Sequence, residues 1–398
     1  MDTIEKKSLS LWQLLLYLLM IGLTFISIPK TSSTYVLYIR IVQYFEVLFC
    51  FALLYQNTKQ KIRLNRYNII INSWWLFYTL ITYLFALSQV GLTPFFNWMN
   101  IIVFLLLGKS YWEDNMHDSV KYLAIIFSFL IYLNAVLLIL YPEGLWIDRE
   151  WIGRGDPTRY LFGNYNMIGF VCLLGILVQA LYTFSTGRGQ ANLLLIVLIS
   201  IASVAFVGSM TSTVCLTLLG VSLLLKNIIS RHITLFLIIF VIIYLLFFTF
   251  IIWNGYSIDD FSSVARFIEE VLSKNTTFTN RTTIWFNAVS KIKESPLIGW
   301  GVQNTEWNDT YLGGSGPHNL WLMLLLQGGY CLCISFVAIV IYVIKHALRE
   351  TNKVTTISII GLCICFTMSL FEVYNIVQIF LLIQLVYYSR HLSIKQSN

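Results

Sequence analysis

The sequence has few charged residues and few prolines, the residues that interrupt helices. Only 11% of its 398 residues are charged and six are proline, whereas 58% are hydrophobic and 16% are aromatic. No soluble globular domain needs that much apolar surface, and uncharged apolar runs of about 20 residues are typical of helices that span a bilayer. The net charge of +7 is therefore a signal of membrane topology and does not point to nucleic-acid binding.

Signals of disulfide, metal and cofactor chemistry are also missing. The seven cysteines all fall within apolar runs, which argues against a disulfide framework or a zinc site. The sequence contains no Walker A loop, no H-E-x-x-H pair and no Cys/His metal spacing. We therefore expect neither a metal nor a cofactor.

About 12 apolar stretches have the length that a bilayer span requires. They lie at residues 11–28, 35–55, 69–89, 94–108, 121–141, 164–184, 191–208, 211–225, 233–253, 318–344, 354–372 and 374–390. The chain is therefore predicted to be an all-α polytopic membrane protein.

The distribution of Lys and Arg predicts how these spans are oriented. They are concentrated at the termini and in every second connection. These residues are Lys6, Lys7, Lys59, Lys61, Arg63, Arg66, Lys109, Lys121, Arg188, Lys226, Arg231, Lys345, Arg349, Lys353, Arg390 and Lys395. Because basic connections stay inside, both termini are predicted to be cytoplasmic, which agrees with an even number of spans.

Two long connections, 142–163 and 254–317, then face outward, and we expect any chemistry there. The second contains two amphipathic stretches, 262–274 and 282–293, whose apolar residues share one helical face. Such helices lie on a membrane face or cap a cavity. The chain thus divides into residues 1–253 with nine spans, the partly helical extracytoplasmic loop 254–317, and residues 318–398 with three spans and a cytoplasmic tail.

Arg281 and His318 are the first candidates for a site in the longer loop. Arg281 precedes an amphipathic helix, and a helix N-terminus beside a guanidinium is suited to phosphate. The alternative is a solvated or snorkelling arginine. His318 follows a glycine-rich segment at the start of a span, where the helix dipole favours the neutral imidazole of a general base. The alternative is that His318 and Asn319 only cap that span.

Further candidates lie in the shorter loop and within the spans. Arg154 and Arg159 alternate with aromatic residues, a pattern that suits a sugar phosphate and equally an interfacial belt. Arg40 falls inside a predicted span, where a charge is a functional candidate by default. Glu372, at the outer end of a span, is either a belt residue or an acid near the site.

Several of these residues occur in an ordered set of motifs. NRTTIWFNAVSKIKESPLIGWG (280–301) is followed by a glycine-rich loop and by PHNLWLMLLLQGGY (317–330), and TRYLFGNYNMIGF (158–170) lies upstream. This order resembles the signature region of the O-antigen ligase and Wzy polysaccharide polymerase superfamily, with R-x-x-x-W, P-L-x-G-x-G and an H-N pair at the start of a span.

The resemblance implies a GT-C-like fold and metal-independent glycosyl transfer on the outer membrane face, from a glycan carried on undecaprenyl pyrophosphate. It implies that Arg281 binds the pyrophosphate, that Arg159 is a second basic contact, and that His318 is the base. The other residues expected to bind substrate are Arg40, Arg154, Asn166 and Asn319. Expected partners are membrane lipid, a flippase and a chain-length regulator.

The chain departs from the superfamily in one turn. Many relatives carry a Ser-Arg pair before the eighth span, where this chain reads GSMTST at 208–213. Either Arg40, Arg154 or Arg159 supplies the charge, or the donor is bound differently. We favour a polymerase of a bacterial capsule or O-antigen pathway, with a ligase to a lipid, protein or wall acceptor as the alternative. A flippase is the alternative of another class, although no internal repeat typical of transporters is visible.

Overall fold

The computed structural model describes residues 65–85, 112–152, 156–254, 281–314 and 316–392. It also describes residues 25–27 and isolated positions between 37 and 55 and between 95 and 105. The spans predicted at 11–28, 35–55 and 94–108 therefore lie wholly or largely outside the described residues. The amphipathic stretch at 262–274 lies entirely outside them.

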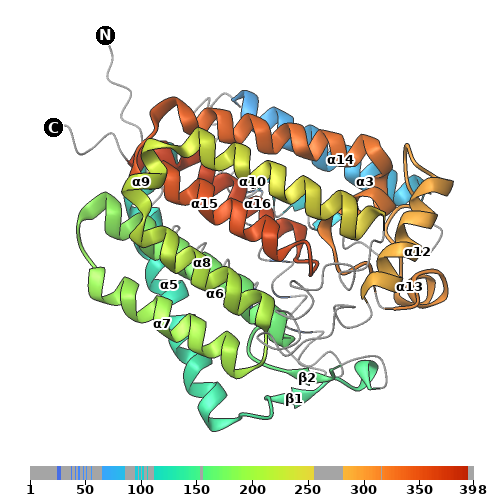
Figure 1. The fold of residues 1–398 in the computed structure, drawn as a ribbon, viewed down its shortest axis with the longest axis horizontal. Coiled ribbons are helices and arrows are strands. Elements are labelled where there is room, and N and C mark those ends of the chain that lie inside the picture. The colour runs from blue at the N-terminus through green and yellow to red at the C-terminus, as the bar shows by residue number, and fades with distance from the viewer. Residues whose placement is uncertain are drawn as a thin grey trace.

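The described part of the chain is mostly helical (Figure 1). The helices are α3 (Arg66–Phe85), α5 (Glu113–Leu140), α6 (Tyr165–Thr186), α7 (Gln190–Phe206), α8 (Met210–Leu224), α9 (Lys226–Arg231), α10 (Ile233–Phe247), α12 (Arg281–Glu294), α13 (Thr305–Leu312), α14 (Leu320–Ala347), α15 (Lys353–Met368) and α16 (Ile376–Tyr388). Helix α10 continues as the π-helical segment η3 (Phe248–Trp253), and α16 continues as the short turn η7 (Ser389–Leu392). Within the 142–163 connection, β1 (Trp146–Ile147) pairs antiparallel with β2 (Thr158–Arg159).

These helices support the predicted membrane architecture. Among the described residues, four segments are long and apolar enough to cross a bilayer: Asn115–Leu140, Tyr165–Thr186, Ile233–Trp253 and Leu320–Glu350. Helices α7, α8, α15 and α16 are apolar but shorter. Every predicted span that falls on described residues coincides with a helix, although the bounds differ. Helix α5 begins at Glu113, two turns before the predicted start, so Lys121 lies within the helix and not in a connection.

Burial separates central helices from peripheral ones. Helices α6, α15 and α16 are buried over nearly their whole length and form the centre of the bundle. Helix α10 is apolar on all sides, and Ile233 is its one buried residue. A helix that is hydrophobic all round and still exposed is suited to face lipid.

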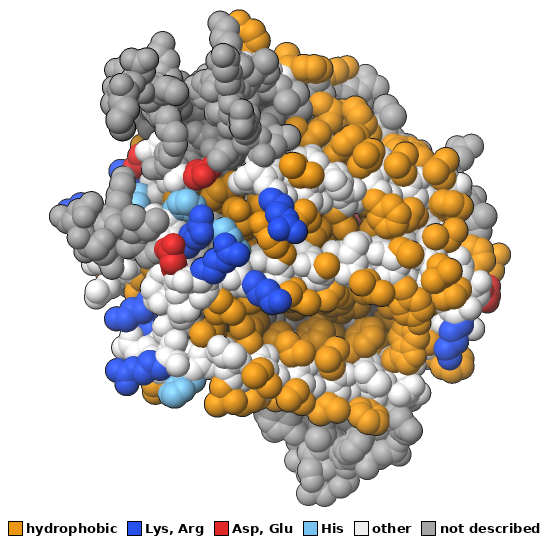
Figure 2. Space-filling model, turned by 90° about the horizontal axis from the view of Figure 1, so that it is seen from above, with side chains coloured by type: hydrophobic (Ala, Val, Ile, Leu, Met, Phe, Trp, Pro, Cys, Tyr) orange, Lys and Arg blue, Asp and Glu red, His pale blue; other side chains and the backbone are white. Residues whose placement is uncertain are grey.

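The two ends of the bundle differ in charge. The connections between α6 and α7, α8 and α10, and α14 and α15 all lie at the end marked by α9 in Figure 1, together with η7. The basic residues of this end are Arg188, Lys226, Arg231, Lys345, Arg349, Lys353 and Arg390. Figure 2 shows most Lys and Arg side chains of the upper face gathered toward that end, with apolar side chains over much of the rest. We call it the basic end.

Helix α14 is broken in its first half at Gly329, where φ is 61° and ψ is −162°. The segment 296–301 replaces the helical hydrogen bonds lost there. Trp300 N donates to the Leu326 carbonyl over 2.7 Å, and Gly301 N donates to the Gln327 carbonyl over 3.0 Å. In return, the N–H groups of Tyr330 and Cys331 donate to the carbonyls of Pro296 and Leu297, over 2.7 and 3.2 Å.

The break requires glycine because backbone approaches backbone. A Cβ atom on Gly329 would lie 2.2 Å from the Leu297 carbonyl carbon and 2.5 Å from Ile298 N. Helix α3 also packs beside the break, where Trp74 Nε1 donates to the Leu332 carbonyl over 3.4 Å. The P-L-I-G-W-G motif and the Gly328–Gly329 pair are therefore two halves of one structure, which fastens the outer loop to α14.

Replacing Gly329 by Ala should destabilise the protein severely. The left-handed φ and the backbone overlap together cost roughly 3 kcal/mol or more. We expect a lower melting temperature of the purified full-length protein and less of it in membranes. Gly316→Ala is the matched control, because a Cβ there meets no heavy atom within 4 Å. Equal melting temperatures for the two variants would contradict this account of the break.

Candidate active site

Three connections that are far apart in sequence meet at the carboxylate of Glu372, which lies between α15 and α16. Its Oε2 atom is 3.2 Å from Nη2 of Arg281, and its Oε1 atom is 3.3 Å from Nδ1 of His318. Asn166, in the first turn of α6, donates from Nδ2 to Oε2 over 2.5 Å. We call Asn166, Arg281, His318 and Glu372 the Glu372 cluster.

Arg281 is the first residue of α12, and that helix is held against the loop that leads to His318. Its stripe of Trp285, Ala288, Val289 and Ile292 is buried, as the amphipathic pattern predicts. Trp285 Nε1 donates to the Pro317 carbonyl over 3.1 Å, one residue before His318. The Arg281 guanidinium also donates to the Phe371 carbonyl. Its side chain is therefore fixed toward Glu372.

His318 is held in an unusual backbone conformation. Its φ is 46°, in the left-handed region that a residue with a side chain seldom adopts. Such strain persists where the surroundings determine it, and it is enriched at functional sites. Because Nδ1 faces the carboxylate, Nε2 is the ring nitrogen left to meet a ligand, as in a base oriented by an acid.

Asn319 caps helix α14 and is fully buried. Its Oδ1 atom accepts from the N–H groups of Trp321 and Leu322, and its Nδ2 atom donates to the Leu370 carbonyl over 2.9 Å. The structure therefore places the helix start at Leu320. The cap also ties α14 to the connection that carries Glu372, which fixes the positions of His318 and Glu372 relative to each other.

The ionisation of Glu372 follows from its neighbours. Burial works to raise the pKa of this carboxyl group, but the hydrogen bond from His318 and the positive charge of Arg281 outweigh burial. The net result is a pKa below the ordinary value. Glu372 is thus a carboxylate at neutral pH, which can orient the imidazole and stabilise a proton on it.

The turn at 208–213 is connected to the cluster through Asn166. The Ser209 hydroxyl donates to Asn166 Oδ1 over 3.0 Å and lies 2.9 Å from Ser212 Oγ. In this chain, the turn thus contributes neutral polar groups to a chain of hydrogen bonds that ends at Glu372.

Arg159 lies on β2, is 7% exposed, and makes its contacts within its own connection. Its Nε atom is 3.3 Å from Asp148 Oδ2, its Nη1 atom donates to the carbonyls of Asp156 and Thr158, and its guanidinium covers the Trp151 ring. None of these contacts joins it to the Glu372 cluster. Arg40 and Arg154 lie outside the described residues.

Residues 194–337 match the family model described as O-antigen ligase. The predicted resemblance is confirmed. The matched region runs from α7 into α14 and includes Arg281, His318 and Asn319, whereas Asn166 and Glu372 lie outside it. The family indicates a glycosyltransferase-like role in the assembly of O-antigen or related polysaccharide from lipid-linked oligosaccharide. A comparison with curated proteins finds no match.

Sequence reasoning left the role of Glu372 open, and the structure places this residue at the centre of the cluster. It lies 54 positions from His318 and 91 from Arg281 along the chain, so no local pattern joins them. The available signal was an acidic residue at the outer end of an otherwise apolar span. An ionisable residue in an apolar span is a candidate for a functional site, and its partner is sought among residues of opposite charge on the same side of the membrane.

Glu372→Gln should lower stability at neutral pH and should also change its pH dependence. Losing charge-assisted hydrogen bonds costs about 1.5–3 kcal/mol. Because the folded-state pKa is lowered, the stabilisation is complete above the unfolded-state pKa of about 4.3 and is lost as the pH falls through the folded-state pKa. The gap in melting temperature between wild type and variant should therefore narrow on acidification.

The matched control is Glu306→Gln, because Glu306 is exposed on α13. We expect this variant to melt like the wild type across the same pH range. A gap for Glu372→Gln that stays constant from neutral to acidic pH would contradict the assigned ionisation.

Proposed function

We propose that this protein is a polysaccharide polymerase that acts on the outer face of the cell membrane. It transfers a growing glycan from undecaprenyl pyrophosphate to the non-reducing end of another lipid-linked repeat unit. The observation that carries the proposal is the joining of Arg281 and His318 to one carboxylate, with both residues inside the region that matches the O-antigen ligase family.

In this mechanism His318 is the base and Glu372 orients it. Nε2 takes the proton of the acceptor hydroxyl as that oxygen forms its bond to the anomeric carbon of the donor. The bond between the anomeric carbon and the pyrophosphate oxygen breaks, and the pyrophosphate leaves on its lipid. The hydrogen bond from Nδ1 to Glu372 stabilises the imidazolium that forms.

Arg281 stabilises the leaving pyrophosphate. Pyrophosphate is already a good leaving group, so the protein has to neutralise its charge and align the acceptor. A guanidinium fork is suited to this task because it can bind two phosphate oxygens at once. Its present partners, Glu372 and the Phe371 carbonyl, hold the guanidinium in position at the start of α12.

The remaining predicted substrate contacts enter the proposal in three groups. Asn166 and Asn319 act as positioning residues, because their amides bind Glu372 and the connection beside it. Arg159 orders the 142–163 connection through Asp148. Arg40 and Arg154 remain predicted contacts to the donor phosphates.

We place the protein in a bacterial cell membrane, with both termini in the cytoplasm and the Glu372 cluster outside. The charge difference between the ends of the bundle supports this orientation. The basic end would face the cytoplasm according to the positive-inside rule, and the Glu372 cluster belongs to the connections of the opposite end (Figure 1).

A ligase that moves the finished glycan to a lipid, protein or wall acceptor is the second candidate, supported by the description of the matching family. Both reactions use the same donor and the same base. They differ in the acceptor, which is a lipid-linked repeat unit for the polymerase and the final carrier for the ligase.

The test is glycan length in a strain that lacks the gene. Complementation with wild type should restore long polymer. His318→Ala should slow transfer by about 10² to 10⁴-fold and Arg281→Ala by about 10² to 10³-fold, leaving single repeat units. His232→Ala and Arg231→Ala are matched controls, because these residues are exposed at the basic end. Membrane levels of all variants are measured alongside.

Each outcome assigns the function differently. Polymer that forms without the protein and stays on its lipid carrier identifies a ligase. Repeat units that stay on the cytoplasmic side in the strain without the gene identify a flippase. Long polymer in well-expressed His318→Ala and Arg281→Ala strains overturns the site.

A further inference from the structure

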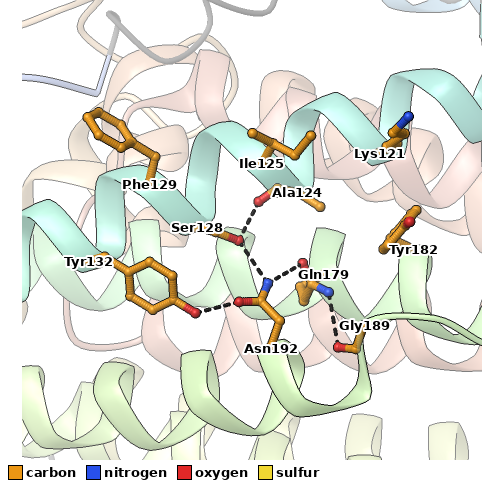
Figure 3. Close-up of a pocket in the computed structure, with 10 residues that line it drawn as sticks. All are labelled: Lys121, Ala124, Ile125, Ser128, Phe129, Tyr132, Gln179, Tyr182, Gly189 and Asn192. Atoms are coloured by element: carbon orange, nitrogen blue, oxygen red, sulfur yellow. Dashed lines mark hydrogen bonds between the residues drawn. The ribbon is translucent and has the colours of Figure 1, made fainter.

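A pocket of about 400 Å³ lies between α5, α6 and α7, away from the Glu372 cluster (Figure 3). Its lining includes Lys121 of α5, Gln179 and Tyr182 of α6, and Gly189, which precedes α7. Gly189 belongs to the connection between α6 and α7, so the pocket lies in the part of the bundle nearest the basic end. Nothing in the proposed transfer reaction uses it.

The floor of the pocket is a polar network inside an otherwise apolar bundle. Tyr132 donates its hydroxyl to Asn192 Oδ1 over 2.5 Å, and Asn192 Nδ2 donates to Gln179 Oε1 over 3.0 Å and to Ser128 Oγ over 3.3 Å. Gln179 Nε2 donates to the Gly189 carbonyl over 3.4 Å. Figure 3 shows these contacts joined along one wall.

The polar groups of this floor use all of their donor hydrogens within the protein and keep free acceptor sites. The hydroxyl hydrogens of Tyr132 and Ser128 and the amide hydrogens of Asn192 and Gln179 are all used within the protein, the second hydrogen of Gln179 Nε2 in a bond to Thr183 Oγ1 over 3.2 Å. Amide and hydroxyl oxygens each have two lone pairs, so oxygens of the floor can still accept. The floor is therefore suited to a ligand that brings hydroxyl groups.

The mouth of the pocket combines apolar side chains with one cation. Ile125 and Phe129 line it and are 55% and 63% exposed, so they present apolar surface outward from α5. Lys121 lies one turn before Ile125 on the same face of α5 and is also exposed. In a membrane, this surface faces lipid chains, and a lysine near a helix end reaches the headgroup region.

We propose that this pocket binds an anionic phospholipid of the leaflet at the basic end. The phosphate pairs with Lys121, hydroxyl groups of the headgroup donate to the acceptor-lined floor, and an acyl chain lies over Ile125 and Phe129. The positive charge of this end makes an anionic lipid the matching occupant, and phosphatidylglycerol has both a phosphate and free hydroxyls.

The test is native mass spectrometry of the full-length protein purified in detergent, with dioleoylphosphatidylglycerol or dioleoylphosphatidylcholine added. We expect wild type to retain the glycerol lipid in preference to the choline lipid. Lys121→Gln should bind it about fivefold more weakly, and Lys121→Arg should restore binding. Ile125→Trp, which places a larger side chain at the exposed mouth, should also lower retention. Melting temperatures show whether each variant is folded.

Arg231→Gln is the matched control, because Arg231 is an exposed arginine at the same end and does not line the pocket. It should retain lipid like the wild type. Equal losses for Lys121→Gln and Arg231→Gln would overturn the proposal, since they would indicate general attraction to a basic surface. Equal retention of the two lipids, or displacement of phosphatidylglycerol by a lower concentration of undecaprenyl phosphate, would also overturn it.

Discussion

The break in helix α14 is the constraint on which the arrangement of the site depends. Backbone that leaves the helical path at membrane depth has to find other hydrogen-bond partners within the protein. Here the segment 296–301 supplies them, because its N–H and carbonyl groups pair with both sides of Gly329. The segment can approach only because Gly299 and Gly329 have no side chains. The outer loop is thereby attached to α14, and α12, which ends at Glu294 just before this segment, is positioned with it.

A second set of contacts joins that assembly to the C-terminal helices. Asn319 caps α14 and binds the Leu370 carbonyl, while Leu320 N donates to Ser369 over 2.9 Å. Glu372 follows immediately and meets Arg281, His318 and Asn166. Backbone interactions therefore set the positions of the connections, and the charged groups complete a geometry that is already fixed. It matters for stability that the backbone fixes the geometry, because a buried ion pair that had to organise its own surroundings would be a weak source of stability.

Hydropathy was enough to predict the described spans but not the contacts between them. Spans such as α6 and α10 could be predicted because length and apolar content alone define them, and α12 could be predicted from the spacing of Trp285, Ala288, Val289 and Ile292. The resemblance selected Arg281 and His318. Glu372 stayed undecided, since its partners come from three other connections. Arg159 presents the reverse case: its neighbour Asp148 is only 11 positions away, but the hairpin that pairs them has strands of two residues each, too short for a periodic signal.

Three basic residues of the described outer connections differ physically from those of the basic end. Arg159, Arg281 and Lys291 each face a carboxylate, namely Asp148, Glu372 and Glu294. Pairing does not alter topology, because acidic residues contribute little to the positive-inside rule. It allows a guanidinium group to be buried, as Arg159 is, or largely buried, as Arg281 is, since a buried charge without a partner would lose its hydration uncompensated. At the basic end, Arg188 and Arg231 are exposed, and so is Lys121, which lines the pocket next to that end. There the cost of burial is absent, and the positive charge is free to interact with the anionic surface of a membrane.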